Sequence, residues 1–334
     1  MKEEILSRIQ KKFPLVPKPF KVIADELEMS EEEVLTILQE EKKKNIIRQT
    51  SAIFDTKRLG YTSSLVAFKI PEEKISAAVK IINAHPGISH NYERNHEFNI
   101  WFTLAVAPDS KLGLDKTLEI LSELTEAEEY IMLPTLKLFK INVKLNTTGK
   151  DEKKEKVKKV VHTDIDLTPL HHQVIRKAQY NIEMVSEPFK AIIDDLNIDY
   201  DTFFAILAEL QEAGVMRRFA SILNHRKAGF NANAMVVWDV EEGEKGEEIG
   251  ATAAAFSAVS HCYLRPKYKN WQYNLFTMVH GKTTEETNGI IAEMEKEIES
   301  KTHMPLYSSR EFKKVRIEYF TPAFEAWEDQ HISA

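Results

Sequence analysis

The chain has 334 residues, 43% of them hydrophobic, and is therefore long enough for about two to four domains with packed cores. Its formal net charge of -7 argues against a protein that coats nucleic acid non-specifically. A single cysteine, Cys262, excludes a disulfide framework and a multi-cysteine metal site. The sequence contains no apolar run of membrane-spanning length and no signal-peptide pattern at its start. We expect a cytoplasmic globular protein that does not contact membranes.

The second half of the sequence repeats the first. Three pairs of segments match in order along the chain: 18–27 with 187–196, 46–49 with 215–218, and 90–94 with 261–265. So long a collinear match predicts a tandem duplication of a whole pair of domains. Between the copies, residues 147–162 hold six lysines against three acidic residues and little to bury, which is typical of a charged, solvated linker.

The first 60 residues have the pattern of a winged helix-turn-helix. Apolar residues at positions 5, 6 and 9 share one helical face, and residues 20–27 carry the apolar stripe of a second short helix. Ser30 and Glu33 form a capping box that begins a third helix. An extended segment, residues 46–54, follows as the wing. The second copy repeats this pattern over residues 163–230, where Thr168 and Pro169 begin its first helix.

The rest of each copy reads as an α+β domain. In the first copy, over residues 61–146, strands and helices are expected in the order βαββαβ, at 61–70, 72–84, 88–92, 98–106, 110–124 and 136–143. That order predicts a ferredoxin-like fold, repeated over residues 231–322 in the second copy. We expect the two halves to pair through these sheets within one chain, and a further oligomer is compatible with the sequence.

The helix-turn-helix raises the question of DNA binding. Residues 25–41, which include the expected recognition helix, hold eight acidic residues and no Lys or Arg. Residues 196–214 of the second copy hold four acidic residues and no basic one. Protein affinity for duplex DNA comes largely from neutralised phosphates, which such helices repel. We therefore predict that the chain does not bind nucleic acid, although these acidic residues are also what a solvated face would carry.

Cations and aromatic residues gather elsewhere. Alternate residues of a strand share a face, so the pattern His-x-Tyr-x-Arg places an imidazole, a phenol and a guanidinium in one row. The candidate site consists of the two rows, His90, Tyr92, Arg94 and His261, Tyr263, Arg265, with His96 beside the first and Arg48, Arg217, Arg218 and His225 at the wings. Such rows suit an aromatic polyanion. For a single copy, capping of the sheet by Tyr and His is the simpler interpretation, but the repetition favours function.

These residues lie in motifs that resemble a known family, the sirohaem decarboxylases. The motifs are FPLVP (13–17), HPGISHNYER (85–94) and FNIWFTL (98–104) in the first copy, and VMRRF (215–219), HCYLRP (261–266) and YNLFTMVHG (273–281) in the second. The first copy is similar to the A-type subunit of that family and the second to the B-type, on the fold of leucine-responsive and asparagine-type regulators. Residues 182–186 depart from the FPLVP motif, which puts the first contacts of that wing in doubt.

The resemblance implies a reaction that converts two acetate side chains of sirohaem to methyl groups, giving 12,18-didecarboxysirohaem for haem or haem d1 synthesis. No cofactor or protein-bound metal is needed, because the iron tetrapyrrole is the substrate. His90 or His261 would donate a proton or ligate its iron, and Tyr92 and Tyr263 would position an acetate. Substrate carboxylates would bind Arg48, Arg94, Arg217, Arg218, Arg265, His96 and His225.

Two other functions remain open from the sequence. One is a transcription regulator of the leucine-responsive type that senses an anionic metabolite, which the acidic recognition helices oppose. The other is a non-catalytic haem-binding protein, which the same rows would permit.

Overall fold

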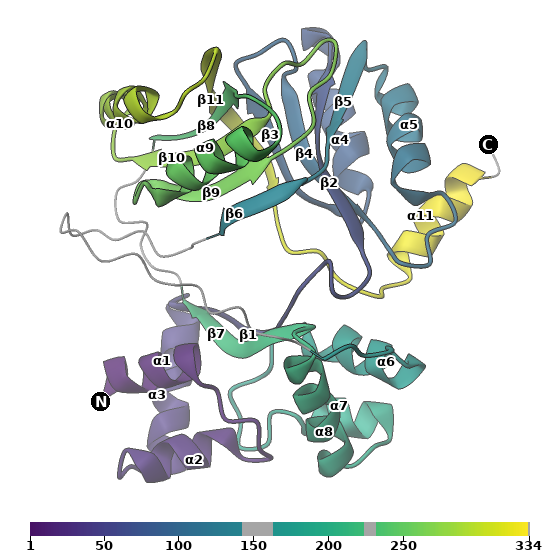
Figure 1. Ribbon diagram of the computed structural model, residues 1–334. Helices are drawn as coiled ribbons and strands as arrows, with labels where there is room; N and C mark the ends of the chain where they lie inside the picture. The colour runs from purple at the N-terminus through teal and green to yellow at the C-terminus, as the bar shows by residue number, and fades with distance from the viewer. Residues whose placement is uncertain (142–162, 224–231, 333–334) are drawn as a thin grey trace. The chain divides into compact units, whose positions relative to one another are not determined.

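A computed structural model describes residues 1–141, 163–223 and 232–332. The chain forms two compact units. The first comprises Met1–Tyr61, Lys158–Lys227 and Glu318–Pro322, and the second comprises the remaining segments. Each unit therefore contains the same kind of domain from both copies, and Figure 1 shows the elements of each. In the described part of the chain, every helix is too short or too polar to cross a membrane.

The first unit holds both winged helix-turn-helix domains. Their elements are α1 (Lys2–Lys11), α2 (Pro19–Glu26), α3 (Glu31–Lys43) and β1 (Ile47–Phe54) in the first copy, and α6 (Pro169–Ala178), α7 (Lys190–Leu196), α8 (Tyr200–Glu212) and β7 (Met216–Leu223) in the second. The capping box of Ser30 and Glu33 is present at α3, and Thr168 with Pro169 at the first helical position begins α6. These local predictions are confirmed.

The two wings join the two copies within this unit. Strand β1 pairs antiparallel with β7, and the buried hydroxyls of Thr50 and Ser221 lie 2.6 Å apart across the pair. Phe13 of the first copy packs on Phe219 of the second, with ring centroids 5.2 Å apart. Both domains therefore share one core. The pairing of β1 with β7 satisfies the backbone N–H and C=O groups along the paired edge of each wing.

The recognition helices keep the acidic character that the sequence predicts. Glu32, Glu33 and Glu40 of α3 are exposed, and the basic residues Lys42 and Lys43 stand only in its last turn. Cations at a helix C-terminus interact favourably with the backbone carbonyls there. The backbone carbonyls at the end of α3 therefore account for Lys42 and Lys43 without a contact to DNA.

The second unit is a curved mixed α+β domain built from both copies. Its first-copy elements are β2 (Thr62–Lys69), η1 (Glu72–Lys74), α4 (Ile75–Ala84), β3 (Ile88–Arg94), β4 (Ile100–Val106), α5 (Gly113–Thr125), β5 (Glu129–Leu133) and β6 (Lys137–Ile141). Its second-copy elements are β8 (Ala232–Asp239), α9 (Glu244–Ala255), β9 (Val259–Leu264), β10 (Leu275–Gly281), α10 (Thr284–Glu297), β11 (Thr302–Lys314) and α11 (Ala323–Ile332). The strands form one sheet in the order β5-β2-β4-β3-β11-β8-β10-β9-β6.

The copies exchange strands in this sheet. The second copy's β11 pairs with β8 through residues 302–307 and with the first copy's β3 through residues 308–314. In return, the first copy's β6 pairs with β9 of the second. The strand predicted at 136–143 is present as β6, but it crosses to the second copy. The fourth strand of the first copy is β5, which the sequence-based prediction missed. Pro134, which lacks an amide hydrogen, separates the two strands.

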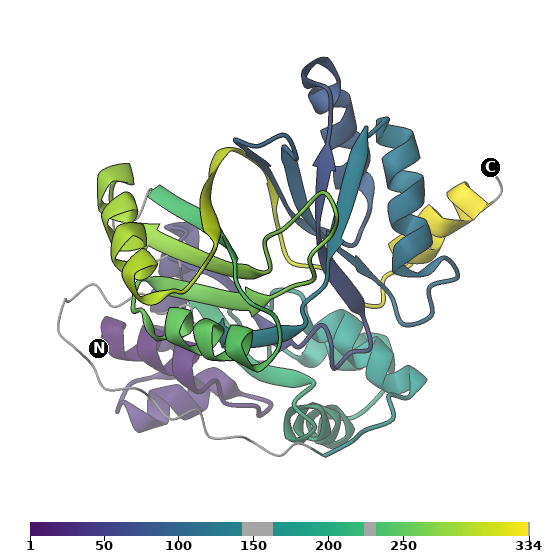
Figure 2. The ribbon, with the colours of Figure 1, turned by 45° about the horizontal axis from the view of Figure 1, so that its top comes forward.

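Helices cover the outer faces, and the inner faces meet. Residues such as Phe68, Phe102 and Leu121 form the core under α4 and α5, and Trp238 and Met294 lie in the matching core under α9 and α10. A third cluster joins the copies through ten buried residues: Ala67, Phe98, Trp101, Ile131, Leu133, Met235, Val237, Trp271, Phe276 and Leu306. Figure 2 shows β11 running between the two halves of the sheet.

The expected second-copy domain ends at residue 322, and the chain continues past it into α11. Trp327 packs in the first copy's outer core, and Glu328 accepts a 2.9 Å hydrogen bond from the Lys111 amide and another from Ser110 Oγ. The C-terminal helix therefore secures the start of the first copy's α5. The expected linker at 147–162 lies outside the described residues.

Cutting the chain between the copies should leave them assembled. We expect a protein with a protease site introduced between residues 149 and 161 to elute unchanged on a sizing column after cleavage, because β6 and β11 each pair across the copies. The uncut protein is the control. Release of two half-size fragments under native conditions would contradict the exchange.

Candidate functional site

The first row lies on β3, and its side chains stack on one another. The strand alternates between faces, so Asn91 reaches the helix side, where it donates a 2.9 Å hydrogen bond to Asn83 of α4. His90 and Tyr92 are on the other face, with ring centroids 6.3 Å apart and planes at 26°. Cζ of Arg94 lies 5.6 Å from the Tyr92 ring centroid. The row expected from the sequence is thus formed in the first copy.

The second row repeats this geometry on β9. The rings of His261 and Tyr263 are 6.2 Å apart with planes at 20°, and Cζ of Arg265 is 4.8 Å from the Tyr263 ring. Cys262 points to the helix side and is fully buried. Two strands from different copies therefore present the same three groups in the same stack.

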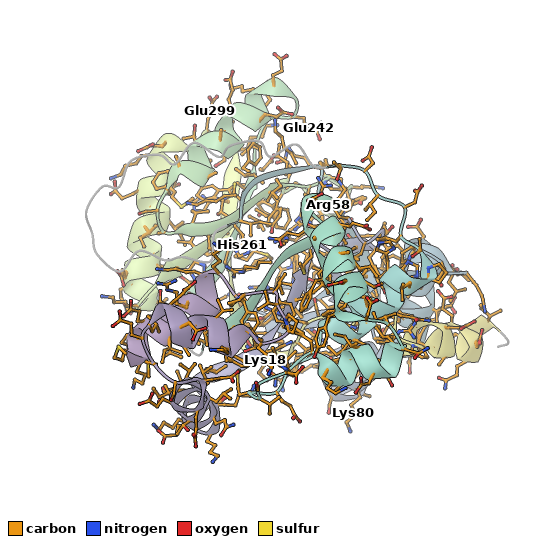
Figure 3. The ribbon with its side chains drawn as sticks, turned by 90° about the horizontal axis from the view of Figure 1, so that it is seen from below. Lys18, Arg58, Lys80, Glu242, His261 and Glu299 are labelled. Carbon is orange, nitrogen blue, oxygen red and sulfur yellow. The ribbon has the colours of Figure 1, made fainter. Side chains whose placement is uncertain are left out.

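Both rows face the apolar cluster that joins the copies. Tyr92 stands opposite Trp101 on β4, and Tyr263 stands opposite Phe276 on β10. Burial lowers the pKa of His261, and a positive charge on His90 would lower it further. Figure 3 labels His261 among the side chains of the strands, whereas Glu242 and Glu299 extend from the periphery of the same unit. Each row therefore borders the same apolar cluster and ends in a buried arginine.

The two arginines are buried without a carboxylate. Arg94 is 6% exposed and Arg265 is 9% exposed, and among the described residues neither has an acidic side chain within ion-pair distance. Arg94 Nη1 donates to the Leu306 carbonyl at 2.8 Å, and Arg265 Nη1 donates to the Leu133 carbonyl. Neither Nε has a hydrogen-bond partner in the part of the chain that the structure describes. Burial lowers both pKa values to about 10. A buried cation without an anion costs free energy, so this arrangement suits an anionic ligand.

The histidines are neutral in the ligand-free protein at neutral pH. Burial lowers the pKa of His90 and of His261. The charge of Lys314 lowers the pKa of His90 further, and protonation of His90 would lower that of His261 further. The carboxylate of Glu311 partly opposes this effect, because its negative charge raises the pKa of His90. Tyr92 stays protonated, because burial first and the charge of Glu311 second raise its pKa to about 12. Bound carboxylates would raise both histidine pKa values again.

This shift predicts the pH dependence of turnover. If an imidazolium donates the proton, kcat/KM should fall as pH rises through a pKa below 6.5, the ordinary histidine value, because kcat/KM reports the free protein. The fall in kcat should come at higher pH, because the anionic substrate raises the same pKa. Parallel pH profiles of kcat/KM and of kcat measure the pKa in the free protein and in the substrate complex. A kcat/KM that rises with pH across this range would refute an imidazolium donor.

The remaining predicted residues have other surroundings. His96 stacks on Phe98 and meets Trp271 edge-on at 5.5 Å, so it lies in the second unit beside the apolar cluster. Arg48, Arg217 and Arg218 are exposed on β1 and β7 of the first unit, and Arg217 forms a 2.7 Å ion pair with Asp55. Their role as substrate ligands remains a prediction. His225 lies outside the described residues.

The structure adds polar residues that the sequence-based prediction missed. Glu311 and Lys314 on β11 stand opposite Tyr92 and His90. Ser89 Oγ lies 2.9 Å from His90 Nδ1, and Ser260 Oγ lies 2.8 Å from His261 Nδ1. The repeated Ser-His dipeptide was a visible signal for these serines. Nothing in the sequence pointed to β11, because that strand reaches the first row only through exchange.

Family models match most of the chain. The model described as "AsnC-like ligand binding domain" matches residues 58–140 and 227–313, and "Siroheme decarboxylase NirDL-like HTH domain" matches residues 2–48. The matched segments are the repeated ferredoxin-like domains and the first helix-turn-helix. The fold predicted from the sequence is confirmed.

Similar proteins agree with these models. A siroheme decarboxylase of Hydrogenobacter thermophilus is 40% identical over 99% of this chain and 98% of its own. The beta subunit of the Methanosarcina barkeri siroheme decarboxylase is 38% identical over 43% of this chain and 95% of its own, so one copy corresponds to a separate subunit there. Crystal structures of the siroheme decarboxylase NirDL, alone and with an iron-uroporphyrin III analogue, have a TM-score of 0.81 at 35% identity and cover 99% of this chain and 98% of theirs. The chain belongs to the family of sirohaem decarboxylases.

Proposed function

We propose that this chain decarboxylates sirohaem, converting two acetate side chains to methyl groups and giving 12,18-didecarboxysirohaem. The observation that carries the proposal is the pair of buried arginines, Arg94 and Arg265, which no carboxylate of the described residues neutralises. They lie at the ends of aromatic rows beside Trp101 and Phe276. A flat macrocycle with peripheral carboxylates matches such a surface in shape and in charge.

The chemistry requires a proton and an electron sink. When the carbon–carbon bond to the carboxylate breaks, carbon dioxide leaves and the bonding electron pair stays on the methylene carbon. The conjugated macrocycle can delocalise that pair, so no nicotinamide, flavin or pyridoxal group is needed. One proton delivered to the methylene completes the methyl group. The product then enters haem or haem d1 synthesis.

The residues of each row divide this work. The guanidinium of Arg94 or Arg265 binds a carboxylate and so fixes the macrocycle. The protonated phenol of Tyr92 donates a hydrogen bond that can orient an acetate. His90 and His261 supply the proton, since a histidine pKa lies nearest to the working pH. Two rows, one from each copy, provide an acid for each of the two acetates.

A non-catalytic haem-binding protein could use the same rows. A transcription regulator would need cations along its recognition helices, whereas α3 carries Lys42 and Lys43 only in its last turn and α8 carries no Lys or Arg. One experiment separates the three functions. Anaerobic incubation with sirohaem, absorption spectra to detect binding, and mass analysis of the extracted tetrapyrrole should show binding followed by loss of two carboxyl groups. Binding without a mass change would indicate a carrier. Absence of sirohaem binding would exclude both the decarboxylase and the haem-binding carrier.

A further inference from the structure

The second row is supported by a hydrogen-bond chain that has no counterpart at the first row among the residues that the structure describes. Ser260 Oγ, next to His261 Nδ1, also lies 2.5 Å from Nε2 of His280 on β10. The other ring nitrogen of His280, Nδ1, lies 2.9 Å from Oδ1 of Asn233 on β8. Four side chains on three adjacent strands are therefore linked in the order Asn233, His280, Ser260, His261. Ser260 is buried and His280 is half-buried.

The donors and acceptors of these hydrogen bonds follow one order along the four side chains. With the amide oxygen of Asn233 toward His280, Nδ1 of His280 carries the hydrogen and donates it, because an amide oxygen only accepts. Nε2 of neutral His280 then accepts from the Ser260 hydroxyl. The serine oxygen in turn accepts from Nδ1–H of His261, which leaves His261 Nε2 with a free lone pair. Burial is the main cause that lowers the pKa of His280 to about 4 and so keeps it neutral; protonation of His261 would lower it further, and the charge of Lys314 acts in the same direction.

The first copy cannot form the same hydrogen-bond chain. The strand registers place Ala105 and Ser63 where the second copy has His280 and Asn233, because Ala105 pairs with Ser63 as His280 pairs with Asn233. Ser89 is therefore free to donate its hydroxyl hydrogen to His90 Nδ1, which favours hydrogen on Nε2 of that imidazole. The strands beside the rows differ as well, with Lys314 opposite His90 and Ile141 opposite His261.

We propose that His280, acting through Ser260, is a positioning residue that fixes His261 with its hydrogen on Nδ1 and makes the two rows chemically unequal. In the resting protein the second row presents a lone pair at Nε2, and the first row presents an N–H. His261 must therefore accept a proton at Nε2 before it can donate one to the substrate. The same lone pair could instead ligate the iron of the substrate. His90 can donate a hydrogen bond to a substrate carboxylate at once. The catalytic consequence rests on the proposed function, whereas the tautomers do not.

The first test reads the tautomers without substrate. In the ligand-free, full-length protein labelled with 15N-histidine, long-range proton–nitrogen correlation spectra should show a pyridine-like Nε2 for His261, identified by its loss in His261→Gln. In His280→Ala, Ser260 is released and His261 should shift toward the Nε2–H tautomer. In His280→Gln, the amide oxygen can still accept from Ser260 and should keep the wild-type tautomer. An Nε2–H tautomer in the wild type, or an unchanged one in His280→Ala, overturns the proposal.

The second test reads turnover. The outer hydrogen-bond partners of metal-ligating histidines typically contribute about 10- to 100-fold to activity, and we expect an effect of that order from the partner of His261. We expect kcat with sirohaem to fall by about that factor in His280→Ala, with KM little changed, and to be largely restored in His280→Gln. Equal turnover in all three proteins overturns the positioning role. If wild-type protein does not convert sirohaem, the proposed function fails, and the spectra of the ligand-free protein still decide the tautomer.

Discussion

Replacing His90 or His261 by alanine should leave a protein that binds sirohaem but turns it over about a hundred- to ten-thousand-fold more slowly, the usual loss for a general acid. The arginines that bind carboxylates remain, so affinity should persist. Each row carries one histidine in the same stack with a tyrosine and an arginine, so a single variant should stall at a monodecarboxylated product if each row serves one acetate.

His303→Ala provides a matched control. His303 is a partly buried histidine of the same unit, but it stacks on Trp238 in the core under α9 and α10 rather than facing the rows. Its loss should leave turnover unchanged. Single-turnover reactions followed by mass detection measure all the variants. Wild-type rates in His90→Ala, His261→Ala and the double variant would mean that neither histidine is the acid.

Replacing Arg94 or Arg265 by methionine should weaken sirohaem binding by about 10- to 100-fold. A charge-assisted hydrogen bond contributes roughly 1.5 to 3 kcal/mol, and about 1.4 kcal/mol corresponds to a factor of ten. The thermal midpoint of the ligand-free protein should change little, because removing an unneutralised buried cation offsets the lost bond to the Leu306 or Leu133 carbonyl. Spectroscopic titration and thermal melts measure the two effects.

The control for charge alone is Arg8→Met, which removes an exposed arginine paired with Glu26 in the first unit. Surface ion pairs contribute little to stability, so this variant should match the wild type in both assays. A large drop in the thermal midpoint of Arg94→Met with unchanged affinity would assign that arginine to the fold instead of the substrate.

Local rules explain what the sequence could predict. The capping residues Ser30 and Thr168 act on neighbouring amides, so their pattern fixes where α3 and α6 begin. Strand periodicity alone places His90, Tyr92 and Arg94 on one face. The repeat of the same triple in the second copy made those residues candidates before any geometry was known.

Long-range pairing explains what the sequence could not predict. The neighbours of a crossing strand depend on the other copy, so the roles of β6 and β11 were hidden, although Pro134 marks the break between β5 and β6. Glu311 and Lys314 approach the first row only through that exchange. The burial of Arg94 depends on the Leu306 carbonyl, more than two hundred residues away in the chain. The link from His280 to His261 needs the register of three strands.

The most direct test of the central claim is a single-turnover reaction of the wild-type protein with equimolar sirohaem, under anaerobic reducing conditions. The tetrapyrrole is extracted at intervals and its mass is determined. Our account predicts that sirohaem disappears through a monodecarboxylated species to a product that has lost two molecules of carbon dioxide. Recovery of bound sirohaem with all its carboxyl groups intact, from protein whose spectrum shows full binding, would contradict it.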